Sequence, residues 1–104
     1  MRASEAVFDA LADPTRRRIV EALGAGPATA GELAAELPVT RQAVVKHLAL
    51  LADVGLVRGE RDGRRMVFRL TPGAFADAAR WMHDVGASWD RRLETLGRRA
   101  TKPR

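Results

Sequence analysis

Residues 29–54 read TAGELAAELPVTRQAVVKHLALLADV, and this stretch decides the fold. Thr29 and Glu32 fit a capping box, in which each side chain satisfies the backbone amide of the other residue, so a short helix is expected to begin here. The Pro-Val pair that follows ends this helix. Thr40 then suits the N-cap of a second helix over residues 41–54. Two short helices joined by a tight turn are typical of a helix-turn-helix motif.

A cationic hairpin is predicted immediately downstream, over residues 56–70. Residues 56–61 and 64–70 are strand-like runs on either side of Asp62-Gly63, a pair suited to a type I′ turn because both central residues then need a positive φ. The hairpin carries four arginines at or near its tip and along its length: Arg58, Arg61, Arg64 and Arg65. A helix-turn-helix followed by such a hairpin is the order of a winged helix-turn-helix.

Further helices are predicted on both sides of this unit. Residues 4–12 form a first helix, Asp13-Pro14 begins a second, and Thr71-Pro72 caps a last helix over residues 72–96. An apolar stripe at helical spacing runs along the last helix and holds Phe75, Ala78, Met82, Val85, Trp89, Leu93 and Leu96, with Trp81 beside it. Residues 97–104 are basic and aperiodic, and we expect them to fray.

The terminal stripe has two interpretations. It could complete the core of one protomer, or it could pair with a second copy of the chain. Seven positions over about six turns exceed what so small a domain needs, so the helices over 4–12 and 72–96 are predicted to form a homodimer interface. Trp81 and Trp89 are then interface anchors, since aromatic residues are enriched at such contacts.

Length and composition bound the fold class. The chain has 104 residues, 46% of them hydrophobic and 30% charged, which suits one folded domain over 1–104. We therefore predict a mainly α (α+β) winged helix-turn-helix with about five helices and a two-stranded β-hairpin wing, dimerising through its terminal helices. The absence of cysteine excludes disulfides and thiolate metal sites. No long apolar segment or secretory leader is evident, so a cytoplasmic protein without a membrane partner is expected.

Charge points to a polyanionic partner. The formal net charge is +5, and residues 41–69 hold seven basic and three acidic side chains, the most cationic third of the chain. A genome rich in arginine codons would raise the charge as well, so charge alone does not decide for nucleic acid. Catalysis has little support, because the sequence shows no phosphate-binding glycine loop, no metalloprotease motif and no definable Ser-His-Asp pattern. We predict that the protein is not an enzyme and needs no cofactor.

The second helix of the motif is suited to the major groove of DNA. Val44, Leu48 and Leu51 form its inward stripe, which turns four side chains to the opposite face: Gln42, Val45, Lys46 and Ala49. Glutamine can pair with adenine, lysine can donate to guanine or phosphate, and a valine methyl can contact thymine. Thr40 and Arg41 stand beside the positive end of the helix dipole, where phosphates are favoured. An ordinary solvated helix face is the simpler alternative, but the neighbouring turn and hairpin favour DNA.

The sequence also resembles a known family. Residues 10–23 (ALADPTRRRIVEAL), 39–57 (VTRQAVVKHLALLADVGLV) and 61–65 (RDGRR) look like the ArsR family of bacterial repressors. The resemblance covers roughly residues 5–96. It implies a homodimeric repressor that binds an imperfect palindrome near its own promoter and leaves it on a signal. Carried over by position, it assigns Thr40, Arg41, Gln42, Val45, Lys46 and His47 to the recognition helix, and Arg61, Arg64 and Arg65 to the wing.

Two departures from the family pattern matter. The family often has serine where this chain has Val45, so a hydrogen bond to DNA is lost there and the operator cannot be copied from relatives. The cysteines and the paired carboxylate and histidine ligands of metal-sensing members are absent. His83 has only Asp84 beside it, and adjacent helical residues point about 100° apart, so we expect a polar surface or dimer-contact residue rather than a ligand. For His47, a local hydrogen bond or a phosphate contact is expected instead of metal binding.

Other classes remain open at this stage. The winged helix could be a scaffold whose last helix binds a different protein, without specific DNA binding. RNA binding is less favoured, because the chain lacks the aromatic strands that stack single-stranded bases. The sequence does not identify an operator, an effector or the direction of regulation.

Overall fold

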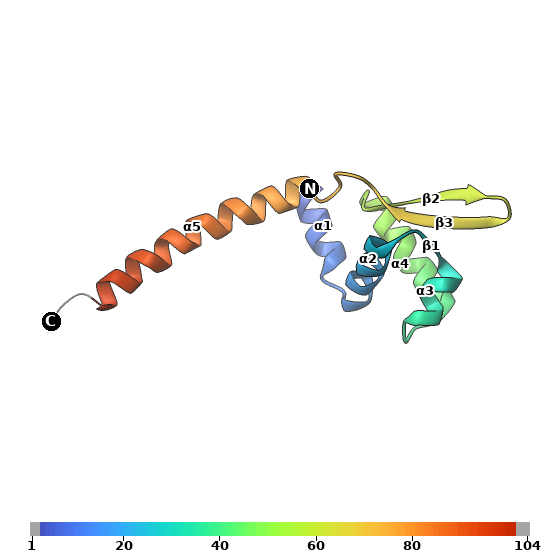
Figure 1. Cartoon of the computed structure of the whole chain (residues 1–104), viewed down its shortest axis with the longest axis horizontal. Helices are drawn as coiled ribbons and strands as arrows, with labels where there is room; N and C mark the ends of the chain where they lie inside the picture. Colours follow the sequence, from blue (N-terminus) through green and yellow to red (C-terminus); the bar gives the residue numbers. More distant parts are fainter. Residues whose placement is uncertain (1–2, 102–104) are drawn as a thin grey trace.

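The computed structural model describes residues 3–101, which form five helices and three strands (Figure 1). In chain order these are α1 (Ala3–Leu11), α2 (Pro14–Ala25), β1 (Ala28–Thr29), α3 (Ala30–Glu36), α4 (Arg41–Asp53), β2 (Val57–Asp62), β3 (Arg65–Leu70) and α5 (Ala76–Thr101). Helices α1 to α4 and the sheet gather into one body, and α5 leaves it as a long rod. Among residues 3–101, no helix combines the length and the apolar character needed to cross a bilayer.

Side-chain caps begin three of the helices where the sequence predicts them. The Asp13 carboxylate accepts from the amide of Arg16 at 2.9 Å at the start of α2. At the start of α3 the Thr29 hydroxyl accepts from the Glu32 amide at 3.1 Å, and the Glu32 carboxylate accepts from the Thr29 amide at 2.8 Å. The Thr40 hydroxyl caps α4. These bonds satisfy amides that a helix leaves without partners, so the boundaries of the motif are set locally.

The sheet has three strands: the two strands of the predicted wing, β2 and β3, and the short strand β1, which the sequence did not predict. The strand order is β1-β3-β2, antiparallel throughout. Ala28 pairs with Phe68 and Thr29 pairs with Val67. A strand of two residues is too short to show an alternating sequence pattern. Strand β1 is defined only by its hydrogen-bonded pairing with β3 of the wing. As a result, the chain enters α3 directly from the sheet.

The hairpin turn lies one residue later than predicted and is of another type. Asp62 still pairs with Arg65, so the loop consists of Gly63 and Arg64. Gly63 has a φ of +63°, while no non-glycine residue between 3 and 101 has a positive φ. Type I′ requires a positive φ at both central positions and is excluded, whereas glycine at the first position alone is the pattern of type II′.

Helix α5 begins four residues later than predicted and extends further. Thr71 to Phe75 form a turn in which Gly73 adopts a φ of +75° and the Ala74 amide donates to the Thr71 carbonyl at 3.1 Å. Pro72 therefore lies in this turn rather than in the first turn of a helix. The helix then continues to Thr101, beyond the predicted end at residue 96, and residues 102–104 lie outside the described residues.

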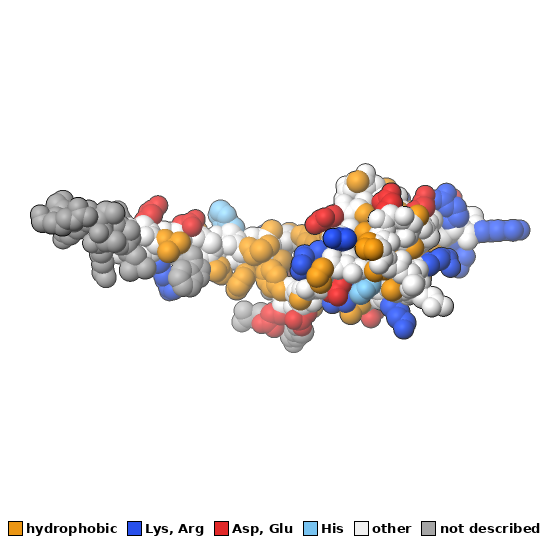
Figure 2. Space-filling view, turned by 90° about the horizontal axis from the view of Figure 1, so that it is seen from below, with side chains coloured by type: hydrophobic (Ala, Val, Ile, Leu, Met, Phe, Trp, Pro, Cys, Tyr) orange, Lys and Arg blue, Asp and Glu red, His pale blue; other side chains and the backbone are white. Residues whose placement is uncertain are grey.

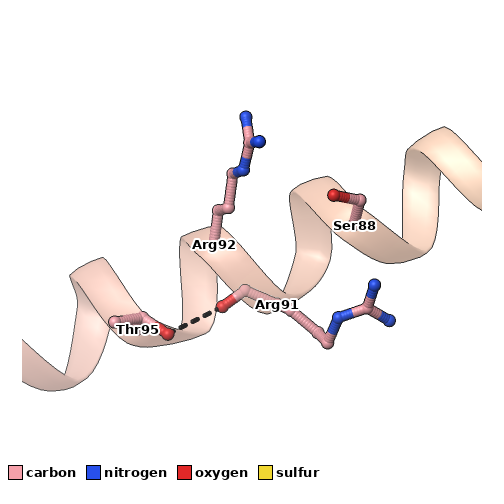
Figure 3. Close-up of a pocket in the computed structure, with 4 residues that line it drawn as sticks. All are labelled: Ser88, Arg91, Arg92 and Thr95. Atoms are coloured by element: carbon pink, nitrogen blue, oxygen red, sulfur yellow. Dashed lines mark hydrogen bonds between the residues drawn. The ribbon is translucent and has the colours of Figure 1, made fainter.

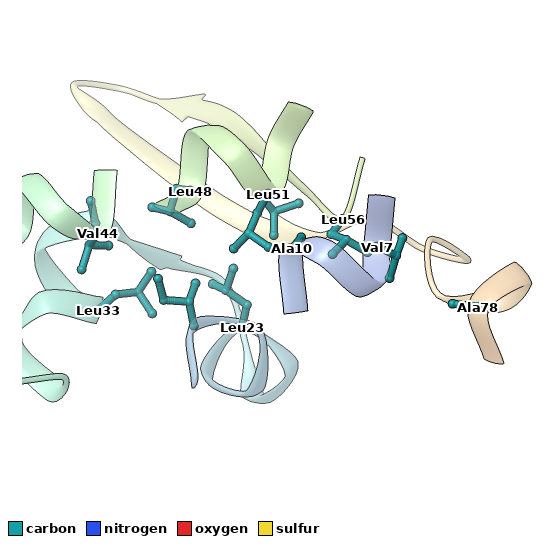
Figure 4. Close-up of a cluster of buried hydrophobic side chains, with 12 residues drawn as sticks. Val7, Ala10, Leu23, Leu33, Val44, Leu48, Leu51, Leu56 and Ala78 are labelled. Carbon is teal, nitrogen blue, oxygen red and sulfur yellow. The ribbon is translucent and has the colours of Figure 1, made fainter. Parts of the chain in front are cut away.

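The core of the body lies between the helices and the inner face of the sheet (Figure 4). Its buried side chains are Val7, Ala10, Ile19, Leu23, Ala30, Leu33, Val44, Leu48, Leu51, Leu56, Val57 and Ala78. The predicted inward stripe of α4 is therefore confirmed. Helix α5 joins this core only near its start, where the rings of Phe8 and Trp81 meet with centroids 5.3 Å apart at a tilt of 59°, a favourable aromatic geometry. Helix α1 thus connects α5 with the rest of the body.

Candidate nucleic-acid interface

The outward face of α4 carries the polar side chains that the sequence predicts there. Arg41, Gln42, Val45 and Lys46 are exposed and line a shallow hollow of about 560 Å³. Val45 is 48% exposed although it is apolar. The packing of Val44, Leu48 and Leu51 into the core explains this orientation, because it fixes the rotation of the helix about its axis. An exposed valine among hydrogen-bonding side chains suits the edges of base pairs.

A second hollow separates α4 from the wing. Its volume is about 450 Å³, and its walls come from α4, the start of α3 and strand β3. The lining residues are Thr29, Ala30, Gly31, Arg41, Val45, Arg64, Arg65, Met66 and Phe68. We call this hollow the wing groove. Three of these residues are arginines and the others are mostly small or apolar, so the wing groove is lined by both cationic and apolar side chains.

The three predicted wing arginines do not share one environment. Arg61, Arg64 and Arg65 are all exposed. The Arg65 guanidinium lies 3.4 Å from the Glu32 carboxylate, and this pair ties the wing to α3. Within the described chain, Arg61 and Arg64 have no ion pair and point their charge to solvent. Figure 2 shows Lys and Arg side chains gathered at this end of the molecule.

Another arginine of the hairpin is neutralised locally. Arg58 lies 3.3 Å from Glu60, and Arg69 lies 3.6 Å from the same carboxylate. These three side chains lie on the outer face of the sheet, where they form a small ion cluster. Arg58, which the sequence placed with the wing arginines, therefore contributes less free charge than Arg61 or Arg64.

Two of the caps lie beside the interface, and both have carboxyl groups with lowered pKa values. The pKa of Asp13 lies below its ordinary value of 3.8, chiefly because the Arg16 amide donates to the carboxylate. The pKa of Glu32 lies below its ordinary value of 4.5, chiefly because of the Thr29 amide, with a smaller contribution from the charge of Arg65. Both carboxylates are therefore ionised at neutral pH and hold their helices in place.

His47 differs in burial from the other predicted contacts on α4, which are all exposed. It is half-buried, and its Nδ1 lies 3.4 Å from a terminal nitrogen of Arg16 on α2. Of the two expectations for His47, a local hydrogen bond or a phosphate contact, this contact corresponds to the first. Arg16 itself was not predicted as a functional residue. The only signal for it is the run of three arginines after Asp13-Pro14, and that run does not show which of the three faces α4.

The predicted dimer residues divide into covered and exposed ones. Trp81, Met82 and Leu93 are 49%, 52% and 57% exposed, which is high for such large apolar side chains. Phe75 packs against the core and Val85 is half-buried. Ala78 is 2% exposed and belongs to the core of its own protomer, so it has little surface to offer a second copy. The side chain of Trp89 lies outside the described residues.

Helix α5 also carries a hollow on the part that leaves the body (Figure 3). It is lined by Ser88, Arg91, Arg92 and Thr95, and the Thr95 hydroxyl donates to the Arg91 carbonyl at 3.0 Å. All four residues belong to this one helix, so the hollow has no opposing wall. Within residues 3–101, no cluster of three or more His, Cys, Asp or Glu side chains could hold a metal ion.

Comparisons with known proteins agree with this arrangement. Residues 11–60 match a family model described as a helix-turn-helix domain. The chain is 45% identical to the HTH-type transcriptional regulator Rv2034 of Mycobacterium tuberculosis, over 88% of this chain and 83% of that protein. It is 32% identical to the transcriptional repressor SdpR of Bacillus subtilis, over 73% of this chain and 84% of that protein.

Solved structures give the same result for the whole fold. An ArsR-like transcriptional regulator from Rhodococcus sp. RHA1 is 39% identical, with a TM-score of 0.76 over 97% of this chain and 95% of that one. The homodimeric winged helix-turn-helix DNA-binding domain of Mb0332 from Mycobacterium bovis is 28% identical, with a TM-score of 0.64 over 89% and 83% of the two chains. From its sequence, its fold and these relatives, the chain belongs to the ArsR family of winged helix-turn-helix, DNA-binding transcriptional regulators.

Proposed function

We propose that the protein is a homodimeric repressor that binds a palindromic DNA operator. The observation that carries this proposal is the continuity of the outward face of α4 with the cationic wing groove. A helix that fits the major groove and a hairpin that reaches the adjacent backbone thus lie on one surface. The repressor assignment is supported by the name of the similar SdpR protein.

The individual side chains take separate roles in this proposal. Gln42, Val45 and Lys46 read base edges, because they stand on the exposed face of α4. Thr40 and Arg41, at the start of the helix, bind phosphates. The wing arginines bind the backbone or the minor groove: Arg61, Arg64 and Arg65. His47 is assigned a supporting role instead, because its ring contacts Arg16.

The dimer interface follows from the exposed apolar side chains of α5. Trp81, Met82 and Leu93 lie on a helix that the body covers only near its start. Burying them against the same helix of a second copy stabilises the dimer by about 25 cal/mol for each Å² of apolar surface that is removed from water. A two-fold axis then places two α4 helices in successive major grooves, about 34–36 Å apart. Two-fold symmetry makes the operator palindromic.

A DNA-binding titration tests the proposal. The full chain is titrated with the DNA upstream of its own gene and with a scrambled duplex of equal composition. The titration is repeated over a series of salt concentrations, and the mass of each complex is recorded. Two chains per site, a preference for the upstream DNA and a steep salt dependence are expected. Equal and weak binding to both duplexes would contradict DNA recognition and favour a protein-interaction module.

A further inference from the structure

Arg16 is held by three hydrogen bonds at the junction of three helices. Its amide donates to the Asp13 carboxylate at 2.9 Å, which fixes its backbone in the first turn of α2. Its Nε donates to the carbonyl of Ala10, in the last turn of α1, at 2.6 Å. Its terminal nitrogen reaches Nδ1 of His47 on α4 at 3.4 Å. One side chain therefore joins the end of α1 to the middle of the recognition helix.

The chemistry of the two groups determines the direction of this contact. A guanidinium group has five donors and no acceptor, so Arg16 is the donor and the Nδ1 of His47 is the acceptor. Lysine cannot replace this arrangement, because a single ammonium lacks the rigid fork that reaches two acceptors at fixed angles. The Ala10 carbonyl is also one of the helix-end carbonyls that have no partner within α1.

The same junction is continuous with the dimerisation helix. Val7 and Ala10 of α1 lie in the buried core, and Phe8 packs on Trp81 of α5. A polar contact at the end of α1 therefore acts on an element that is packed against α5. We propose that Arg16 is a positioning residue, which fixes the orientation of α4 relative to α1 and, through α1, relative to α5.

This inference rests on the proposed function, because its consequence is the spacing between two half-sites. If Arg16 sets the angle between α4 and the dimer axis, it selects the separation at which both recognition helices fit their grooves. An added base pair moves one half-site by about 3.4 Å and turns it by about 34° about the DNA axis. The wild-type protein should therefore discriminate strongly between operators of different spacing.

The test uses duplexes selected by the wild-type protein from a random pool. Dissociation constants are measured for the selected palindrome and for versions with one base pair inserted or removed at its centre. In Arg16→Lys the discrimination between spacings should fall about 2- to 30-fold, the range for residues that couple two elements. Arg16→Gln also removes the positive charge, and the same fall in discrimination is expected. In an Arg16→Lys background, His47→Leu should change the discrimination no further.

Arg17 provides a matched control. Its guanidinium donates to the carbonyls of Leu11 and Ala12 at 2.7 and 3.2 Å, and within residues 3–101 it makes no hydrogen bond or ion pair with α4. Arg17→Lys should retain the wild-type discrimination between spacings. The inference is overturned if Arg16→Lys and Arg17→Lys behave alike, or if Arg16→Lys weakens binding to all spacings by one common factor.

A measurement without DNA separates this inference from the proposed function. Backbone amide NMR spectra are compared for the wild type, Arg16→Lys and Arg17→Lys. The Arg16 variant should shift signals around His47 on α4 together with signals at the end of α1, whereas the Arg17 variant should shift only the latter. Unchanged α4 signals would overturn the inference. If the wild type selects no DNA, the proposed function fails, and the NMR comparison still decides the role of Arg16.

Discussion

The Glu32 carboxylate lies 3.4 Å from the Arg65 guanidinium, and the same oxygen closes the capping box of α3 by accepting from the Thr29 amide. One side chain therefore starts a helix of the helix-turn-helix and holds an arginine of the wing. Both partners of the ion pair are more than half exposed, so the pair adds little to stability in water. Its importance lies in competition, because the negative charge of Glu32 offsets the attraction of Arg65 for a phosphate group.

This competition predicts the behaviour of Glu32→Gln. Glutamine retains an oxygen that can accept from Thr29, but it removes the negative charge beside Arg65. The variant should bind DNA more tightly, and the slope of log affinity against log salt should steepen by about one unit. Glu60→Gln is the matched control, since it removes one negative charge from the outer face of the sheet and leaves Arg65 paired. Equal slopes for the two variants would contradict the prediction.

The lowered pKa values of the two cap carboxyls predict an acid-sensitive body. A carboxyl group with a lower pKa in the folded than in the unfolded state stabilises the fold above its unfolded pKa, and this contribution is lost as the pH falls through the folded pKa. The loss should therefore begin near pH 4.5 for Glu32 and 3.8 for Asp13 and continue below these values. Melting temperatures between neutral pH and pH 2 test this.

Asp13→Asn isolates one of these two contributions. Asparagine is an equally good N-cap but does not titrate, so the variant should keep its helix and show a shallower loss of melting temperature in acid. An acid profile identical to that of the wild type would mean that the Asp13 cap does not contribute to the pH dependence of stability.

Gln42→Ala should change which operator is preferred. The side chain stands on the exposed face of α4, so its loss should cost about 1–3 kcal/mol on the cognate site and little on a site mutated at the base that it reads. Competition binding against all single-base variants of the selected operator provides the measurement. A uniform loss on every variant would reassign Gln42 to the backbone.

Arg64→Ala should have the opposite signature. Arg64 lies in the two-residue loop at the wing tip and has no ion pair within the described chain, so it is suited to phosphates. Its loss should weaken binding to all sequences alike and reduce the salt slope by about one unit. Unchanged affinity at low salt would show that the wing tip does not touch DNA.

Met82→Glu should convert the dimer into a monomer. Met82 is 52% exposed on the apolar stripe of α5, and a buried unpaired carboxylate there is strongly unfavourable. Arg80→Glu places the same group about 200° around the helix and should remain dimeric. Light scattering after size-exclusion chromatography gives the mass directly. A dimeric Met82→Glu protein would mean that another surface holds the dimer together.

Local signals account for the parts of the fold that the sequence predicted. Thr29, Thr40 and Asp13 cap helices through bonds to amides only three residues away, so the capping residues reveal the start of each helix. The outward face of α4 follows from its apolar spacing in the same way. Such features depend on neighbouring residues alone.

Features that depend on distant partners escaped prediction. Strand β1 exists because Ala28 meets Phe68 across the sheet, and the contact of Arg16 with His47 joins residues on two different helices. Ala78 was assigned to the dimer stripe because periodicity marks an apolar face without indicating what covers it. Ala78 lies in the buried core of its own protomer, and only the three-dimensional arrangement reveals this.

The short strand β1 has a consequence for which DNA shapes the protein would bind. Because the chain passes from this strand straight into α3, the hairpin is fastened to the helix-turn-helix by backbone hydrogen bonds on one side and by the Arg65 pair on the other. The helix-turn-helix and the wing, the two elements proposed to contact DNA, are then held at a fixed separation. A duplex whose grooves already have the matching width binds without deformation. A stiffer or differently shaped duplex must be deformed, and the energy of this deformation lowers its affinity, even through base pairs that no side chain contacts.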